Sequence, residues 1–262
     1  MTNAALHVAR TGLDAQNTKM RVIANNLANV NTTGFKRDRA DFETLAYQQM
    51  IAAGANSDSE NKYATGLALG SGVSLQGTSR TDTQGTLNTT GNSLDLAIEG
   101  AGYFQLQKPD GTIGYTRAGN FSLTAEGTIV SSDGLPLIPQ IQIPEGATSI
   151  TIGNDGSVSA MVPGQAEATQ LGQIETARFV NPAGLQSIGG NLLSETAASG
   201  APQVGVAGLD GRGSVRQGAL EGSNVNVVEE LVDMIETQRA YEVNSKMIKA
   251  TDEMLQYVNQ QL

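Results

Sequence analysis

Both ends of this chain carry apolar side chains at seven-residue intervals, over residues 3–30 and 227–262. A seven-residue repeat with apolar residues at interleaved positions places one narrow apolar stripe along a helix. At 1.5 Å per residue, the two helices would be roughly 40 and 50 Å long. Stripes of this length need a partner to cover them. We therefore expect the terminal helices to pair in a coiled-coil-like layer and to contact other copies of the same chain.

The predicted subunit interface consists of the apolar residues that form these two stripes. On the N-terminal helix they are Leu6, Leu13, Met20, Ile23, Leu27 and Val30. On the C-terminal helix they are Val227, Leu231, Met234, Tyr241, Ile248 and Leu255, and the stripe is widened by Ile235, Val243, Met247 and Met254. The alternative is that each helix packs on the compact part of its own chain. The length of the helices and the strand-like pattern of the middle favour the interface.

Capping signals and charge support this interpretation. Asn226 followed by Glu229 is a capping-box arrangement at the start of the C-terminal helix, and Gly34 suits a left-handed backbone after the first helix. Residues 1–42 contain six Lys or Arg and three acids, whereas residues 221–262 contain three Lys or Arg and eight acids. Opposite charge favours pairing of one helix with the other, within or between chains. Two solvated faces would be the alternative.

The middle of the chain is rich in glycine, and its sequence pattern predicts β-strands. Five acid–glycine pairs mark turns, at 110–111, 126–127, 133–134, 155–156 and 210–211. Short alternating segments between them predict strands at 103–107, 120–124, 128–130 and 149–152. Spacing of about 8–15 residues between strands suits an all-β sandwich or barrel. Residues 36–80 contain many small and polar residues, which predicts an extended irregular loop.

The resulting fold class is α+β, with three predicted domains. Residues 1–35 and 222–262 form a discontinuous helical domain, residues 36–80 form the connector, and residues 81–221 form a β-rich domain.

The residue composition excludes several classes of function. Without cysteine there is no disulfide or thiolate site, and the single histidine, His7, cannot supply a histidine-rich zinc site.

We therefore expect no catalytic residue, no cofactor and no metal, although scattered carboxylates leave a glycosidase-like pair open by counting alone. The isoelectric point near 4.6 argues against a nucleic-acid partner. No apolar run approaches 18 residues, which argues against membrane insertion. Arg10 and Asp14 interrupt any apolar signal region, so we expect export without a cleaved signal peptide.

Several motifs resemble those of bacterial flagellar rod and hook proteins. The N-terminal signature corresponds to residues 24–36 (ANNLANVNTTGFK), and the C-terminal signature to 224–230 (NVNVVEE) and 238–244 (QRAYEVN). Residues 115–121 (YTRAGNF), followed by Ser-Asp-Gly at 132–134, resemble the motif of the family's β domain. The resemblance spans almost the whole chain. The length of 262 residues and the segment GLALGSGV after residue 65 resemble most the members that form the distal rod.

The resemblance implies a structural protein that polymerises into a helical tube, the drive shaft that transmits torque from motor to hook. In such a tube the paired helices line an inner layer around an export channel, and the β domain faces outward. The implied partners are other copies of the chain, proximal rod proteins, the hook protein and surrounding ring proteins that act as a bushing. The implied location is the basal-body rod in the periplasm, reached by flagellar type III export. Residues 44–75 would contact neighbouring subunits.

Two alternatives follow from the same sequence. The first is another axial component of the family, such as a proximal rod protein. The second is a β-rich secreted enzyme or adhesin that acts on cell-wall polymers.

Overall fold

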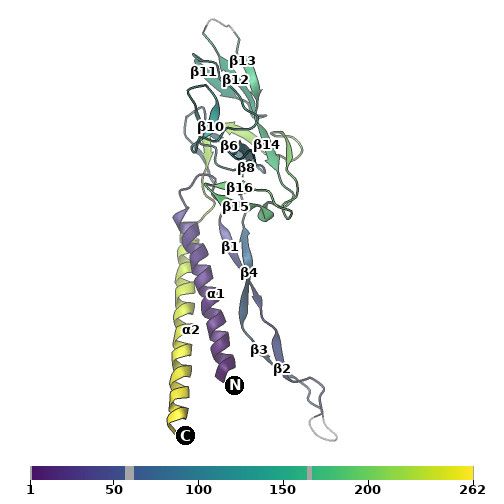
Figure 1. Cartoon of the computed structure of the whole chain (residues 1–262), viewed down its shortest axis with the longest axis vertical. Helices are drawn as coiled ribbons and strands as arrows, with labels where there is room; N and C mark the ends of the chain where they lie inside the picture. Colours follow the sequence, from purple (N-terminus) through teal and green to yellow (C-terminus); the bar gives the residue numbers. More distant parts are fainter. Residues whose placement is uncertain (1, 57–61, 164–166, 262) are drawn as a thin grey trace. The chain divides into compact units, whose positions relative to one another are not determined.

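The computed structural model describes residues 2–56, 62–163 and 167–261 (Figure 1). The chain divides into two compact units, which are described separately below. The helical unit comprises Met1–Leu27, Asp38–Ser79 and Asn226–Leu262, and the β unit comprises Ala28–Arg37 and Arg80–Val225. The chain therefore crosses between the units four times.

Two long helices lie side by side in the helical unit (Figure 1). They are α1 (Thr2–Ala28) and α2 (Val227–Gln261). The helices run antiparallel, because Asn26 near the end of α1 contacts Glu230 near the start of α2. The predicted cap is confirmed: the Val228 backbone N–H donates to Asn226 Oδ1 at 3.1 Å.

The first helix ends earlier than its apolar row. α1 stops at Ala28, and the backbone N–H of Thr32 donates to the Asn29 carbonyl in the turn that follows. The prediction that the helix reaches Val30 was therefore wrong, because the turn chemistry of the asparagine-rich segment overrides the apolar periodicity. Gly34 has the predicted left-handed backbone, with φ +68, and lies beyond this turn.

The rest of the helical unit is a two-stranded ribbon. Its strands are β1 (Asp38–Thr44), β2 (Tyr47–Ile51), β3 (Leu67–Gly70) and β4 (Val73–Arg80). β1 pairs with β4, and β2 pairs antiparallel with β3. The prediction of an irregular loop over 36–80 was therefore wrong for most of that segment; residues 57–61 lie outside the described part. β1 and β2 have no regular apolar alternation, and the glycines at 66, 70, 72 and 77 interrupt the short alternation around β3 and β4, so the sequence pattern predicted a loop.

The β unit assembles short strands into several small sheets. One sheet has the order β15-β16-β8-β7, another has the order β11-β12-β13, and the other strands form the pairs β10–β9, β14–β17, β18–β6 and β19–β5. The strands are β5 (Leu87–Thr89), β6 (Leu96–Glu99), β7 (Phe104–Gln107), β8 (Ile113–Thr116), β9 (Phe121–Leu123), β10 (Ile129–Ser131), β11 (Ser149–Ile152), β12 (Ser157–Met161), β13 (Thr169–Gln173), β14 (Glu175–Arg178), β15 (Gln186–Gly189), β16 (Leu192–Ser194), β17 (Gln203–Val206), β18 (Ser214–Gln217) and β19 (Ala219–Glu221), with a 3₁₀ turn at Pro182–Gly184. The four strands predicted at 103–107, 120–124, 128–130 and 149–152 correspond to β7, β9, β10 and β11.

The β unit has its own apolar core. Phe104 and Phe121 meet edge to face at 5.2 Å in a cluster that also buries Leu96, Leu137 and Val158. A smaller cluster packs Tyr115 against Phe179, and several further side chains join it: Tyr103, Ala177, Leu185 and Leu193. All five predicted acid–glycine turns have a glycine with positive φ. The β unit is therefore a self-contained globular body.

Candidate assembly surface

The face of α2 that meets α1 buries polar groups. Glu230 and Thr237 are only 4% and 1% exposed. Asn26 of α1 donates through Nδ2 to both carboxylate oxygens of Glu230, at 3.2 and 3.3 Å. The side chain of Asn26 also forms two hydrogen bonds with the backbone of Asp38 at the start of β1. Its Nδ2 donates to the Asp38 carbonyl and its Oδ1 accepts from the Asp38 N–H, each at 2.9 Å. This buried amide therefore ties together both helices and the ribbon.

The seam continues along the helices through small and polar residues. Lys19 Nζ lies 3.9 Å from Asp233 Oδ1, the cross-helix ion pair that opposite charge predicted. Further along, a Cβ at Gly12 would lie 3.0 Å from Asn244 Nδ2. The glycine thus permits a close approach of the two helices. A seam of this composition fixes register more than it removes apolar surface from water.

The opposite face of α2 is apolar and exposed. Its members are Val228, Leu231, Val232, Ile235, Val243, Met247 and Met254, all at least 42% exposed. At about 100° per residue, they lie on the side of the helix away from Glu230, Thr237 and Asn244. We call these seven residues the α2 apolar face. Charged side chains such as Arg239 and Lys246 lie among them, but seven exposed apolar side chains on one side of a helix are typical of an interaction site.

The predicted interface residues divide between buried, half-buried and exposed positions. On the N-terminal side, Ile23 is buried and Leu6, Leu13, Met20, Leu27 and Val30 are half-buried. On α2, Val227, Leu231 and Tyr241 are exposed and Met234 and Ile248 are half-buried. Leu255 lies on α2, but its side chain is outside the described part. The seven-residue row through Met234 and Ile248 therefore lies on the side of the seam, while Leu231 belongs to the α2 apolar face.

Two members of the α2 apolar face were missed by the sequence reasoning. Val228 and Val232 do not lie in the seven-residue row, although a helical wheel at about 100° per residue would place them beside Leu231 and Ile235. The signal that could have identified them is the angular position of each apolar residue around the helix axis. The seven-residue repeat alone identified the seam better than the free surface.

The ribbon presents a second exposed apolar surface. Tyr47 and Met50 on β2 are 61% and 55% exposed, and Leu67 and Leu69 on the paired strand β3 are 48% and 47% exposed. Tyr47 pairs with Gly70 in the strand register. A two-stranded ribbon has no second layer to cover such side chains. It therefore also has the composition of an interaction surface.

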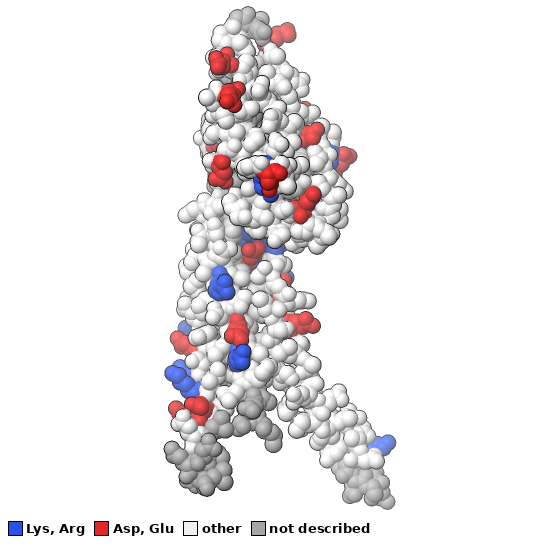
Figure 2. All heavy atoms as spheres, in the orientation of Figure 1, with Lys and Arg blue, Asp and Glu red and all other residues white. Residues whose placement is uncertain are grey.

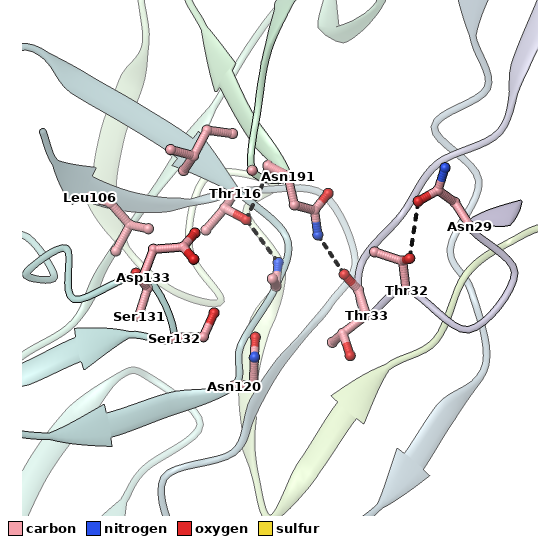
Figure 3. Close-up of a pocket in the computed structure, with 13 residues that line it drawn as sticks. Asn29, Thr32, Thr33, Leu106, Thr116, Asn120, Ser131, Ser132, Asp133 and Asn191 are labelled. Atoms are coloured by element: carbon pink, nitrogen blue, oxygen red, sulfur yellow. Dashed lines mark hydrogen bonds between the residues drawn. The ribbon is translucent and has the colours of Figure 1, made fainter. Parts of the chain in front are cut away.

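The β unit contains a polar cavity of about 430 Å³. In Figure 3, Asn29, Thr32 and Thr33 lie on one side of it and Asp133 on the other, with Asn191 between them. The Asn191 Nδ2 donates to the Thr33 carbonyl at 2.6 Å, which ties the turn after α1 to the β unit. Asp133 is the only acid among the described residues that line the cavity. The cavity thus lacks the carboxylate pair of a glycosidase.

Surface charge is sparse over the β unit. On the face shown in Figure 2, its acidic side chains are scattered, with no basic stripe between them. In the described ranges, no group of three or more His, Asp or Glu side chains could hold a metal ion. Neither helix, within its described residues, is long and apolar enough to span a membrane. The exposed apolar surfaces of the helical unit are therefore the strongest candidates for an interaction site.

Comparison with known proteins matches three parts of the chain to family profiles. Residues 6–36 match the flagella basal body rod protein family, residues 97–160 match the D1 domain of the flagellar hook protein FlgE/F/G, and residues 216–261 match the C-terminal region of the flagellar basal body rod FlgEFG proteins.

Curated relatives align over nearly the whole chain. The flagellar basal-body rod protein FlgG of Buchnera aphidicola subsp. Acyrthosiphon pisum is 52% identical over 98% of both chains. FlgG of Agrobacterium fabrum is 48% identical over 98% of this chain and 99% of its own. The rod protein FlgF of Caulobacter vibrioides is 35% identical over 93% of this chain and 92% of its own.

Proposed function

The chain belongs to the family of flagellar basal-body rod proteins, and from that premise we propose how its exposed apolar surfaces serve assembly. It is a structural subunit of the distal rod and not an enzyme. Identity to the two FlgG relatives is well above the 35% identity to FlgF, which favours the distal rod over another axial position. The cavity with its single acid gives no support to a cell-wall hydrolase.

In this proposal, the α2 apolar face is covered by neighbouring copies of the same chain. The single observation that carries it is the exposure of seven apolar residues on the side of α2 opposite the seam. Their burial in an assembly is favourable at about 25 cal/mol per Å² of apolar area. Contacts that repeat head to tail without closing into a ring produce a helical filament. The helices thereby form the axial layer of a tube.

The other parts of the chain take the remaining roles. The ribbon, with Tyr47, Met50, Leu67 and Leu69 exposed, contacts adjacent subunits. Functionally, residues 1–35 with 222–262 form the axial domain, 36–80 the neighbour-contacting connector and 81–221 the outer domain. The outer domain faces the ring proteins, and the ends of the tube meet proximal rod proteins and the hook protein. In this proposal the subunit reaches its place in the periplasm through the flagellar export apparatus.

A charge placed on the α2 apolar face tests the proposal. Ile235 is 51% exposed, so Ile235→Lys should leave the free chain folded. In the assembly the same lysine would be buried without a counter-ion, which is costly. We expect loss of polymerisation, measured by sedimentation and by electron microscopy of rods.

The matched control is Gln186→Lys, at an exposed residue of β15 in the β unit. It adds the same charge outside the apolar face and should allow polymerisation. Normal rods from Ile235→Lys would contradict the proposed interface. Failure of both variants to the same degree would mean that added charge, and not burial of this face, is responsible.

A further inference from the structure

A single buried carboxylate lies among the segments through which the chain leaves the β unit. The Glu221 side chain at the end of β19 is fully buried. Its Oε1 accepts hydrogen bonds from Lys36 Nζ at 2.5 Å and from the Gly85 backbone N–H at 2.9 Å. Its Oε2 accepts from Arg117 Nε at 2.7 Å. We call Glu221, Lys36 and Arg117 the Glu221 cluster.

Each cation of the Glu221 cluster also holds backbone carbonyls. Lys36 Nζ donates to the Thr83 carbonyl at 2.8 Å. Arg117 Nη1 donates to the carbonyls of Gly100 and Gly102, at 2.8 and 2.7 Å. The cluster is therefore a satisfied network and not an isolated pair, which is the condition for a buried charge to be tolerated.

Three segments meet at this network, and we call them the root segments. Residues 34–37 lie between the turn after α1 and the ribbon, residues 81–86 follow β4, and residues 219–224 precede α2. Together they adjoin the crossings at Arg37–Asp38, Ser79–Arg80 and Val225–Asn226. The ribbon strands β1 and β4 and the segment before α2 are thus each continuous with a root segment.

Backbone and amide bonds join the root segments further. The Gly34 N–H donates to the Glu221 carbonyl at 2.7 Å, and the Gly222 N–H donates to the Thr86 carbonyl at 2.8 Å. Asn224 accepts from the Arg37 N–H at 2.7 Å through Oδ1 and donates to the Thr81 carbonyl at 2.8 Å through Nδ2. One asparagine therefore bridges the other two segments.

Two glycines in the root segments show how closely other backbone segments approach them. Gly34 has φ +68, and a Cβ there would lie 2.6 Å from the Arg117 carbonyl carbon. A Cβ at Gly85 would lie 2.0 Å from the Gly222 carbonyl oxygen. Only residues without a side chain fit at both positions. The backbones around the buried carboxylate therefore leave no room for a side chain at these two positions.

The charge state of the cluster agrees with its geometry. Burial on its own would raise the pKa of Glu221, but the Arg117 charge and the hydrogen bonds from Lys36 and Gly85 outweigh burial and leave that pKa below its usual value. Burial lowers the pKa of Lys36, and the contact with Glu221 opposes this shift. Glu221 is therefore ionised at neutral pH.

We propose that the Glu221 carboxylate is the positioning residue that fixes all three root segments to one another and to the β unit. Removing its charge would loosen the segments as a group, because Lys36, Gly85 and Arg117 all bond the same carboxylate and an amide in its place keeps only one acceptor oxygen and no charge. In the rod, such a joint would pass a load from any one root segment into the whole β unit. That last consequence rests on the proposed function, whereas the joint itself does not.

Amide hydrogen exchange of the free, full-length chain tests the joint. In Glu221→Gln we expect the amides of Gly34, Arg37, Gly85 and Gly222 to exchange at least about tenfold faster, all together. The Ile174 amide, bonded to the Gly156 carbonyl at 2.7 Å, should keep its rate. Glu126→Gln, the same chemical change at an exposed residue of the β unit, should alter none of these rates.

Two further variants keep the test decisive if Glu221→Gln does not fold. Glu221→Asp keeps the charge on a shorter side chain and should speed exchange at the same amides by a smaller factor. Lys36→Met with Glu221→Gln removes one of the buried cations and should recover part of the protection.

Acceleration confined to Gly85, or an equal change at Ile174, would overturn the proposal. Exchange is measured in the free chain, so the result does not depend on assembly. If the unaltered chain failed to form rods while Glu221→Gln still accelerated exchange at all root segments, the proposed function would be contradicted and the proposal about Glu221 would stand.

Discussion

At the scale of single residues, a buried amide at the end of α1 substitutes for a backbone partner. Asn26 is 2% exposed, and its side chain pairs with both the N–H and the C=O of Asp38, as a neighbouring strand would. The same Nδ2 reaches the carboxylate of Glu230. A side chain that offers both a donor and an acceptor is required here, because Asp38 presents one of each.

Replacement of Asn26 by leucine should be costly. The change removes the hydrogen bonds to the N–H and C=O of Asp38, at about 0.5–1.5 kcal/mol each, and the bond to the charged Glu230 carboxylate, at about 1.5–3 kcal/mol. We expect a lower midpoint in chemical denaturation and faster exchange of the Asp38 amide. Asn17→Leu, an exposed asparagine on the same helix, provides the control and should change neither. An unchanged Asp38 exchange rate in Asn26→Leu would refute the assigned role.

At the scale of elements, the ribbon depends on α1 for its position. Its strands have few buried side chains, and an isolated two-stranded ribbon is only marginally stable in water. Besides the bonds of Asn26 to Asp38, a second contact lies at Gly72, between β3 and β4, where φ is +111 and a Cβ would lie 2.2 Å from Thr11 Oγ1. The same hydroxyl accepts from the Val73 N–H at 3.4 Å. The glycine therefore allows the ribbon to rest against the helix.

Gly72→Ala should loosen the ribbon for two separable reasons. The positive φ is unfavourable for alanine by about 1–3 kcal/mol, and the new methyl group collides with Thr11. Limited proteolysis within the ribbon should accelerate, and Thr11→Ala in the same chain should relieve the collision but not the backbone strain. Gly77→Ala in β4, where nothing lies within 4 Å of the added Cβ, should leave cleavage unchanged. Complete recovery in the double variant would show that backbone strain plays no part.

At the scale of the whole molecule, the two units differ in how much of their apolar surface they bury within a single chain. The β unit buries two apolar clusters and the Glu221 cluster within its own chain segments. The helical unit joins its helices by a polar seam and leaves the α2 apolar face and the ribbon surface exposed. Long helices depend on packing of their apolar side for stability. Assembly should therefore stabilise the helical unit much more than the β unit.

Hydrogen exchange of the free chain and of assembled rods measures this difference. In dilute free chain, we expect rapid exchange along α2 and slow exchange in the β unit, and in rods slow exchange in both. The gain in protection along α2 should be at least about a hundredfold, since burial of several apolar side chains contributes several kcal/mol. Equal protection of α2 in the free and assembled states would show that neighbouring copies are not what stabilises it.

The predictions succeeded where local chemistry decides the structure. The cap at Asn226 follows from a side-chain acceptor two residues before the Val228 amide, and the acid–glycine turns follow from the need for positive φ. They failed where no local pattern exists. The ribbon has no buried face to impose alternation on its sequence, and α1 ends at the turn after Ala28 although apolar spacing continues to Val30.

The sequence by itself determined that the ends are helices, that the middle is a β unit and that neither a cysteine site nor a histidine-rich metal site is available, because periodicity, turn residues and composition act locally. Only the tertiary structure decided which side of α2 is free and which residues surround Glu221. Lys36, Arg117 and Glu221 are far apart in the chain, and their pairing depends on three backbone segments meeting in a space that two glycines leave open. Such an arrangement leaves no periodic signal in the sequence, since its energy comes from burial and charge among distant residues.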